Sequence, residues 1–250
     1  MIGNTTKIKF RPDIILTWPK NCDYPVWRYF VKSHRNRFNK IIIAFMEPNS
    51  GIDYSEFIKE AMKNDNITFI NAPAPKVDED WRNLAVNASL KESKSRWVFF
   101  TEQDFMPTGF GFWAVVYEAI KKFDLVGITQ GGRLHPACIF VKRSVVDRTR
   151  KDFGIDFGKG DHFSKFQKDI EKMDIKRVYL ADEKTYQYYH FNGLSQNWRL
   201  ITEEQQPNYE PNNFYDYLDY CLELGNLKLV PLHEEFERVA KLALSRKIIT

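Results

Sequence analysis

Residues 97–100 are a short run of large apolar residues that ends at two acidic residues, Glu102 and Asp104. Tryptophan, valine and phenylalanine without polar alternation are typical of a strand covered on both faces, as in the middle of a parallel sheet. Two carboxylates at alternate positions of an extended segment point the same way, and the carboxyl end of such a strand is where open α/β sheets bind ligands. Because the two charges repel, Mg²⁺ or Mn²⁺ is a natural partner, although two solvated acids would give the same pattern.

Apolar strand segments alternate with amphipathic helical segments along most of the chain. We expect strands at 13–18, 40–45, 67–70, 97–102, 124–129, 136–142 and 177–180. Helices are expected at 24–37, 53–63, 81–93 and 110–123, from Ser144, and at 162–172. This alternation predicts an α/β fold whose mostly parallel sheet is flanked by helices and joined by right-handed crossovers.

The composition changes after residue 202. Residues 203–213 contain Gln-Gln-Pro and Pro-Asn-Asn, which is linker chemistry, and two more helices are expected near 214–224 and 232–245. We therefore expect a main domain at 1–202 and a helical C-terminal appendage at 203–250, which is too short for a sizeable core of its own.

Charge and cysteine content exclude several classes of protein. The net charge of +4 is mild and the basic residues alternate with acids, so we expect no nucleic-acid partner. The three cysteines are widely spaced, which predicts neither a disulfide framework nor a zinc site. Without an apolar stretch of about 18–20 residues or a signal peptide, a cytoplasmic protein is expected. Peripheral attachment to a membrane and the oligomeric state stay open.

Four landmarks then occur in a fixed order. The first strand ends in Thr17-Trp18-Pro19, and Arg82-Asn83 opens the helix before the acidic strand. Glu102-Gln103-Asp104 follows, and a block runs from Gly160-Asp161-His162 to His190. In this order the chain resembles, over about residues 10–195, a GT-A-fold glycosyltransferase, similar to the family-2 nucleotide-sugar transferases. Glu102 stands where that family has the first Asp of its Asp-x-Asp motif, and Gly160 where it often has an acid.

The resemblance implies a GT-A-like sheet and a metal-dependent enzyme of the hexosyltransferase type. Such an enzyme moves a sugar from a nucleoside-diphosphate donor, a UDP-sugar being favoured, to a glycan or another hydroxyl acceptor, with inversion. Asp104 and His190 are the implied ligands of Mn²⁺ or Mg²⁺, and Asp161 is the candidate general base. The alternatives are a turn residue at Asp104, a packed histidine at position 190 and a helix N-cap at Asp161.

The donor pocket is expected at the carboxyl ends of the first strands and around the acidic motif. The candidate residues for binding the nucleotide-sugar are Thr17, Trp18, Glu47, Arg82, Asn83, Glu102, Gln103 and Gly132. Trp18 could instead be core, and Gly132 only part of a tight turn. The sequence contains neither a Walker loop nor GxGxxG, so P-loop and Rossmann interpretations have no support.

Two other functions stay open. The same fold could bind a nucleotide or glycan without turnover, or it could belong to a nucleotidyltransferase. The latter usually carries a glycine-rich loop directly after its first strand, whereas Thr17–Asn21 contains no glycine.

Overall fold

The structure is a computed structural model, and it describes residues 11–18, 38–45, 63, 66–76, 80–102, 105–107, 110–130, 133–156, 162–180 and 188–190. The helix expected at 24–37, all but Lys63 of the helix expected at 53–63, and the appendage at 203–250 lie outside these ranges.

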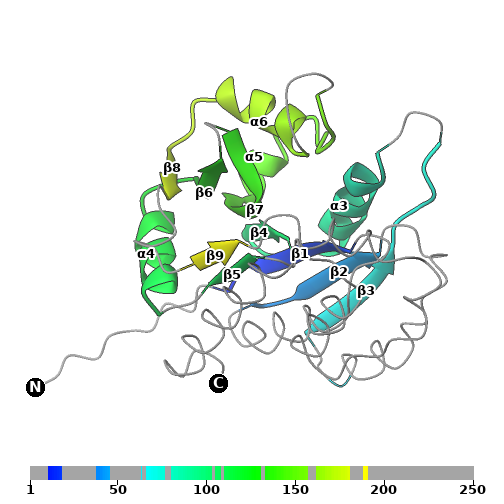
Figure 1. Ribbon diagram of the computed structural model, residues 1–250, viewed down its shortest axis with the longest axis horizontal. Helices are drawn as coiled ribbons and strands as arrows, with labels where there is room; N and C mark the ends of the chain where they lie inside the picture. The colour runs from blue at the N-terminus through cyan, green and yellow to red at the C-terminus, as the bar shows by residue number, and fades with distance from the viewer. Residues whose placement is uncertain are drawn as a thin grey trace, which may run out of the picture.

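Within the described residues, seven strands form one sheet in the order β3-β2-β1-β4-β7-β6-β8 (Figure 1). The strands are β1 (Asp13–Trp18), β2 (Ile41–Phe45), β3 (Ile67–Asn71), β4 (Trp97–Thr101), β6 (Leu125–Gln130), β7 (Arg133–Lys142) and β8 (Arg177–Leu180). Strands β1 to β4 run parallel, as do β6 and β8, while β7 is antiparallel to both of its neighbours. The predicted α/β fold with a mostly parallel sheet is confirmed.

The antiparallel strand β7 differs from the simple strand–helix alternation. Only two residues separate β6 from β7, which is too short for a crossover helix, so the two strands form a hairpin. The strand also begins at Arg133, three residues earlier than the expected start at residue 136. Its register with β6 shifts between Gly127 and Thr129. A Cβ at Gly127 would lie 2.5 Å from Leu134 Cδ1 and 3.2 Å from the Cys138 carbonyl oxygen, so this position favours glycine.

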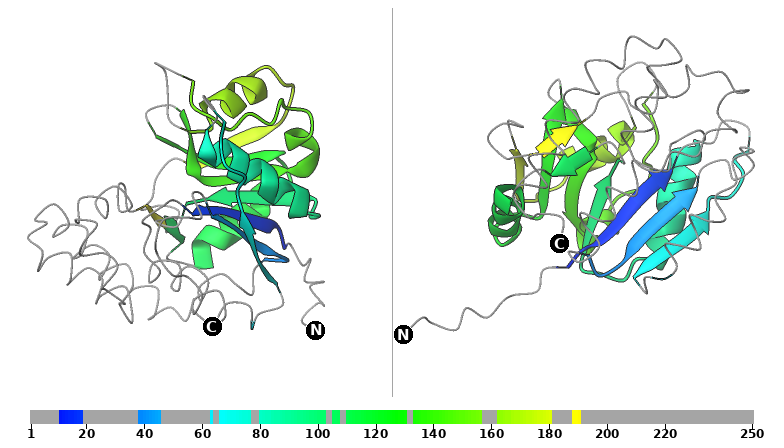
Figure 2. Two further views of the ribbon diagram at one scale, coloured as in Figure 1. Left: turned by 90° about the vertical axis from the view of Figure 1, so that its right-hand side faces the viewer. Right: turned by 60° about the horizontal axis from the view of Figure 1, so that its bottom comes forward.

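Four described helices cover the sheet. They are α3 (Trp81–Glu92), α4 (Phe110–Ile120), α5 (Arg143–Val146) and α6 (Ser164–Glu171). Side chains of α3, α5 and α6 pack on one face of the sheet, whereas those of α4 pack on the other. Figure 2 shows the ribbons of α3 and α4 on opposite sides of the sheet. None of these helices has the length and apolar character needed to cross a bilayer.

Strand β4 is the centre of the core. All five of its residues are buried, and Phe99 and Phe100 belong to the clusters on opposite faces. Phe99 stacks on Phe140 of β7 with ring centroids 3.9 Å apart. Burial of this kind contributes roughly 1.5–3 kcal/mol for each large side chain. The sequence correctly predicted a central strand covered on both faces.

A second, two-stranded sheet joins β5 (Phe105–Pro107) to β9 (Tyr188–His190) in antiparallel pairing. This pairing was not expected from the sequence, because each strand has only three residues and β5 contains a proline. It brings a late segment of the chain to the residues that directly follow the acidic motif (Figure 1).

Candidate functional site

The sheet changes direction between β1 and β4. From β1 the chain proceeds outward to β2 and β3, and then returns to place β4 on the opposite side of β1. At such a switch point the two connections leave in opposite directions, and a crevice opens beyond the carboxyl ends of the two strands. Thr17 and Glu102 lie next to this switch point, which makes it the candidate ligand site.

A cleft lies at this point. It has a volume of about 10 Å³ and is partly open to solvent. It is lined by Ile15, Thr17, Arg82, Val86, Phe100, Thr101, Glu102, Pro136 and Phe163. Pockets for whole ligands measure roughly 300–1,000 Å³. A volume of about 10 Å³ has room for about one water molecule, so the described side chains line only a small part of a nucleotide-sugar site.

The first turn of α3 brings a positive charge to the cleft. Arg82 Nη1 donates to Glu102 Oε1 at 2.6 Å, and both side chains are largely buried, with 17% and 19% exposed. The pair is a charge-assisted hydrogen bond between a helix start and a strand end. Glu102, expected near the metal or the ribose, is therefore bound by the guanidinium.

Arg82 has further capacity to donate. Its Nε is buried and has no hydrogen-bond partner among the described residues. A buried donor of this kind costs free energy unless a partner satisfies it. A ligand with oxygen acceptors, such as a nucleotide base, ribose or phosphate, would supply one.

Asp80 fixes where α3 begins. Its Oδ1 accepts hydrogen bonds from the backbone N–H groups of Arg82 at 2.7 Å and Asn83 at 3.3 Å. This is an ordinary N-cap, which orients the first turn and with it the Arg82 side chain. Asp80 was not singled out from the sequence, although an aspartate directly before a helical segment is a recognisable cap signal.

The second oxygen of Asp80 faces a different segment. Asp80 Oδ2 lies 3.4 Å from His162 Nδ1, and each side chain is 26% exposed. Burial by itself would raise the pKa of Asp80, but the hydrogen bond and charge of His162, together with the two backbone N–H groups, lower this pKa to about 2. Asp80 is thus a stable anion that joins α3 to the turn before α6.

The turn before α6 has an unusual backbone. Phe163 has φ 69°, a left-handed conformation that costs a bulky residue about 1–2 kcal/mol. Its N–H donates to the Phe153 carbonyl oxygen at 2.9 Å, and its ring packs on Phe100 and Phe153 at centroid distances of 5.2 and 5.1 Å. The surrounding contacts therefore hold the turn in place, beside the cleft that Phe163 lines.

The helix that follows this turn, α6, begins later than expected from the sequence. The helix expected from His162 begins at Ser164, and its N-cap residue is Phe163. The left-handed conformation of Phe163 cannot continue a helix toward the N-terminus. The alternative interpretation of Asp161 as the N-cap of this helix is therefore wrong.

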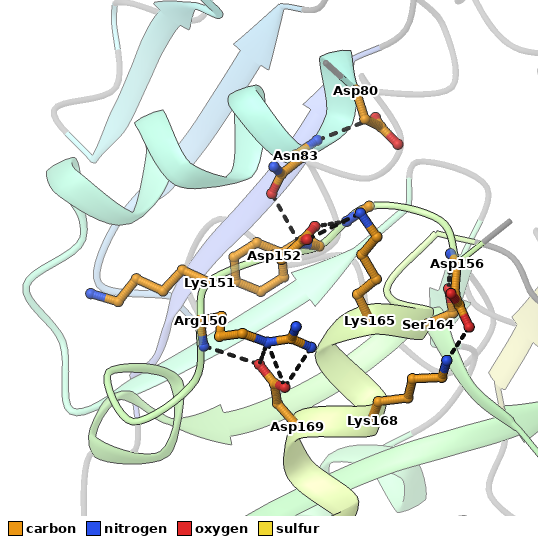
Figure 3. A network of polar contacts seen from close by, with 12 residues as sticks. Asp80, Asn83, Arg150, Lys151, Asp152, Asp156, Ser164, Lys165, Lys168 and Asp169 are labelled. Carbon is orange, nitrogen blue, oxygen red and sulfur yellow. Dashed lines mark hydrogen bonds and ion pairs between the residues drawn. The ribbon is translucent and has the colours of Figure 1, made fainter. Parts of the chain in front are cut away.

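Asn83, expected to bind the donor, has a structural partner. Its Oδ1 accepts from the Phe153 N–H at 2.9 Å and from Asn87 Nδ2 at 3.0 Å, and Asn87 Nδ2 also donates to the Lys151 carbonyl oxygen at 2.9 Å. Asn83 is not among the residues that line the cleft. Figure 3 shows Asn83 and Asp80 side by side above the loop that carries Asp152.

Ion pairs surround this loop. Lys165 Nζ lies 3.1 Å from Asp152 Oδ2, Lys168 pairs with Asp156, and Arg150 binds Asp169 with Nη2 and Oδ1 2.7 Å apart (Figure 3). The hydrogen bond from Arg150 lowers the pKa of Asp169. The loop is thus held to α6 by opposite charges and to α3 by the neutral amide side chains of Asn83 and Asn87.

Thr17 and Thr101 complete the floor of the cleft. Both are buried, with 7% and 4% exposed, and Thr101 Oγ1 donates to the Ala137 carbonyl oxygen at 2.8 Å. The structure therefore brings together three of the expected donor-binding residues: Thr17, Arg82 and Glu102.

The expected metal ligands are only partly described. Among the side chains that the structure describes, no three His, Cys, Asp or Glu residues gather as a metal site. The backbone of His190 pairs with Phe105, the residue that follows Asp104 in the chain. One carboxylate and one imidazole are a donor set that suits Mn²⁺, so the register is compatible with the expected ligand pair.

The other expected residues lie outside the described part. Glu47, Gln103, Asp104, Gly132 and Asp161 are not in the described ranges. For Trp18 and His190 only the backbone positions in β1 and β9 are described.

The comparisons with known proteins bear on the fold. No protein-family model and no curated protein matches the sequence. Residues 1–349 of TarS from S. aureus match with a TM-score of 0.51 at 10% identity, over 75% of this chain and 62% of that chain. PcManGT, a mannosyltransferase from Pyrobaculum calidifontis solved with GDP-Man and Mn²⁺, matches with a TM-score of 0.49 at 14% identity, over 69% and 56%.

A third similar structure is glucosyl-3-phosphoglycerate synthase from Mycobacterium tuberculosis in complex with phosphoglyceric acid. Its TM-score is 0.48 at 13% identity, with 81% of each chain covered. This chain spans less than two thirds of the TarS and PcManGT chains. The likeness to TarS, with the strand order described above, shows the fold and not the activity: this chain has a GT-A-like α/β fold.

Proposed function

We propose that this protein is a glycosyltransferase that moves a sugar from a nucleoside-diphosphate donor to an acceptor hydroxyl. The observation that carries the proposal is the cleft at the switch point between β1 and β4, where Arg82 reaches Glu102. The donor is proposed to be a UDP-sugar, and the acceptor a glycan or another hydroxyl compound.

The donor-binding residues have separate proposed roles. Arg82, with its buried Nε, would donate to an oxygen of the nucleotide. Glu102 holds the guanidinium in place and could accept from the ribose. Thr17 lines the floor. Trp18, the next residue in the chain, would stack on the base.

Around the diphosphate and the donor sugar we propose contacts that the sequence alone suggests. Gln103 would contact the nucleotide-sugar, Glu47 would belong to the pocket for the base and ribose, and Gly132 would let the backbone approach the sugar. Asn83 would contribute indirectly, by accepting the hydrogen bond from the Phe153 N–H that holds this loop beside the site.

Asp104 and His190 are the proposed ligands of a divalent cation, Mn²⁺ or Mg²⁺. Such a cation neutralises the charge that develops on a leaving diphosphate. The register of β5 and β9 supports this choice, because it pairs His190 with the neighbour of Asp104 in the chain.

The acceptor hydroxyl must lose its proton as it attacks the sugar. We propose Asp161 as the base, since it directly precedes the anchored turn at His162 and Phe163. A single displacement with this base would invert the configuration at the anomeric carbon.

A panel of UDP-, GDP-, dTDP- and CDP-sugars, with and without Mn²⁺, tests the proposal. Ligand at a hundredfold excess over its dissociation constant stabilises the fold by about 2.7 kcal/mol, or roughly 5–10 °C in melting temperature. We expect one donor to give this shift, larger with Mn²⁺, and to release nucleoside diphosphate slowly without acceptor. Asp104→Asn should remove the Mn²⁺-dependent part of the shift.

One observation favours a second candidate, a binding protein without turnover. Glu102, in place of the first Asp of the metal motif, is bound by Arg82. A non-catalytic binder would give the thermal shift but release no nucleoside diphosphate. If no donor shifts the melting temperature, neither function holds.

A further inference from the structure

The first turn of α3 contacts three segments that are far apart in the sequence. Arg82 reaches the end of β4, Asn83 binds the backbone of Phe153, and Asp80 faces His162. The donor side of the proposed site and the turn beside the proposed base are therefore both attached to a single helical turn.

The contact between Asp80 and His162 is more than a helix cap. One carboxylate oxygen caps α3 and the other lies 3.4 Å from His162 Nδ1, so the two functions use different atoms. The contact is an ion pair only when the imidazole carries a proton. Its strength therefore depends on pH, while the cap does not need the proton.

Two further charged groups lie next to this pair. An ideal Cβ at Gly154 would be 3.1 Å from Asp152 Oδ1, 3.7 Å from Asp80 Oδ2 and 3.8 Å from Lys165 Nζ. Lys165 is itself paired with Asp152 at 3.1 Å, so these two charges largely compensate each other. His162 is therefore the basic side chain that faces Asp80 Oδ2.

The backbone on the other side of His162 is held as well. Phe163 is locked in its left-handed conformation by the Phe153 carbonyl and by aromatic packing. With Asp80 on the imidazole and Phe153 on the next residue, the position of His162 is set from two directions. Asp161 is joined to His162 by one peptide bond.

We propose that the Asp80–His162 contact is a positioning element that holds the base segment against the donor-binding turn of α3. This inference rests on the proposed function. A displacement of about 1 Å in a reacting group can lower a rate a hundredfold, whereas donor binding through Arg82 does not need the pair.

Two variants remove the ion pair and keep the fold. Asp80→Asn retains the capping ability, because Asn and Asp are about equal as N-caps. His162→Gln keeps a polar side chain without the charge. Asp124→Asn is the matched control, since it breaks another carboxylate–cation pair, with Lys142 at 2.5 Å, at the opposite edge of the sheet.

The first measurement is the rate of donor hydrolysis with Mn²⁺, together with donor affinity by calorimetry. We expect both variants to lower kcat about tenfold or more and to leave the donor Kd within twofold, with Asp124→Asn equal to wild type. Equal kcat in variants and control, or a joint loss of kcat and affinity, would overturn the positioning role.

The second measurement does not depend on activity. Amide hydrogen exchange of residues 162–165, compared at the same pH below 6, should be at least tenfold faster in Asp80→Asn than in wild type. Unchanged exchange would overturn the anchor itself. Wild type that binds no donor but shows the exchange difference would refute the proposed function and the catalytic role of the pair, while the anchor would stand.

Discussion

The amino edge and the carboxyl edge of the sheet differ in how completely their buried charged side chains are hydrogen-bonded within the fold. At the amino edge, the fully buried Asp13 accepts five hydrogen bonds from neutral donors among the described residues. The donors are Asn39 Nδ2, Ser93 Oγ, Ser95 Oγ and the backbone N–H groups of Lys94 and Ser95. Burial would raise the pKa of Asp13, but these hydrogen bonds outweigh it and lower the pKa.

At the carboxyl edge, the charges are arranged for a further partner. Arg82 binds Glu102, and its Nε has no partner in the described part of the chain. Asp13 needs nothing from outside the fold, whereas Arg82 can still bind a ligand. The comparison separates residues that hold the sheet together from residues that we propose bind the ligand.

The largest expected effect is at the amino edge. Asp13→Ala leaves several buried donors without an acceptor and should lower the free energy of unfolding by about 3–4 kcal/mol, measured by urea denaturation. The folded fraction should still bind donor with wild-type affinity. A loss below 1 kcal/mol would mean that Asp13 does not organise this edge, and a loss of donor affinity would remove the division between the two edges.

The next largest effect is at the proposed base. Asp161→Asn should lower the transfer rate about a hundredfold and change donor affinity by less than twofold, because a base acts mainly in the transition state. Single-turnover rates with calorimetry measure both quantities. If affinity falls together with the rate, Asp161 supports the donor site and another carboxylate is the base.

The free energy of unfolding at acid pH tests the charged state of Asp80, which lies at the carboxyl edge. Its pKa is lowered from 3.8 to about 2, so its contribution to stability is present above pH 4 and is lost as the pH falls toward 2. This contribution amounts to about 2 kcal/mol. In urea denaturation between pH 4.5 and 2.5, Asp80→Asn should therefore lose less stability than wild type. Parallel curves for the two proteins would contradict the charged state assigned to Asp80.

The smallest effect expected concerns Arg82. Arg82→Ala should weaken donor binding about tenfold, which corresponds to 1.4 kcal/mol, because one charged hydrogen-bond donor is lost. Arg143→Ala is a suitable control, since Arg143 Nη1 binds the Leu90 and Ser93 carbonyl oxygens at the amino edge. Equal donor affinity in the two variants would remove Arg82 from the site.

The sequence predicted the strands where local composition is sufficient. The uninterrupted apolar run of β4 and the alternation of strands with helices gave the architecture, with boundaries mostly within three residues of those observed. The small sheet of β5 and β9 was missed, because three-residue strands carry almost no pattern and their pairing joins distant segments.

The site was predictable only in part, for the same reason. Thr17, Arg82 and Glu102 follow from strand ends and a helix start, and the structure brings them to one cleft. The Asp80–His162 contact and the Asp13 cluster depend on segments that meet only after folding. Phe163 is also hidden from the sequence, since a bulky residue gives no local sign of a left-handed conformation.

The most direct test of the account is hydrogen exchange across the whole sheet with and without a nucleoside-diphosphate sugar and Mn²⁺. The account predicts slower exchange with ligand at the carboxyl edge, in the first turn of α3 and at Thr101–Glu102. The amino edge around Asp13 and Ser93–Ser95 should be unchanged. Protection at the amino edge alone, or the same exchange at both edges with and without ligand, would contradict the claim that the cleft between β1 and β4 is the donor site.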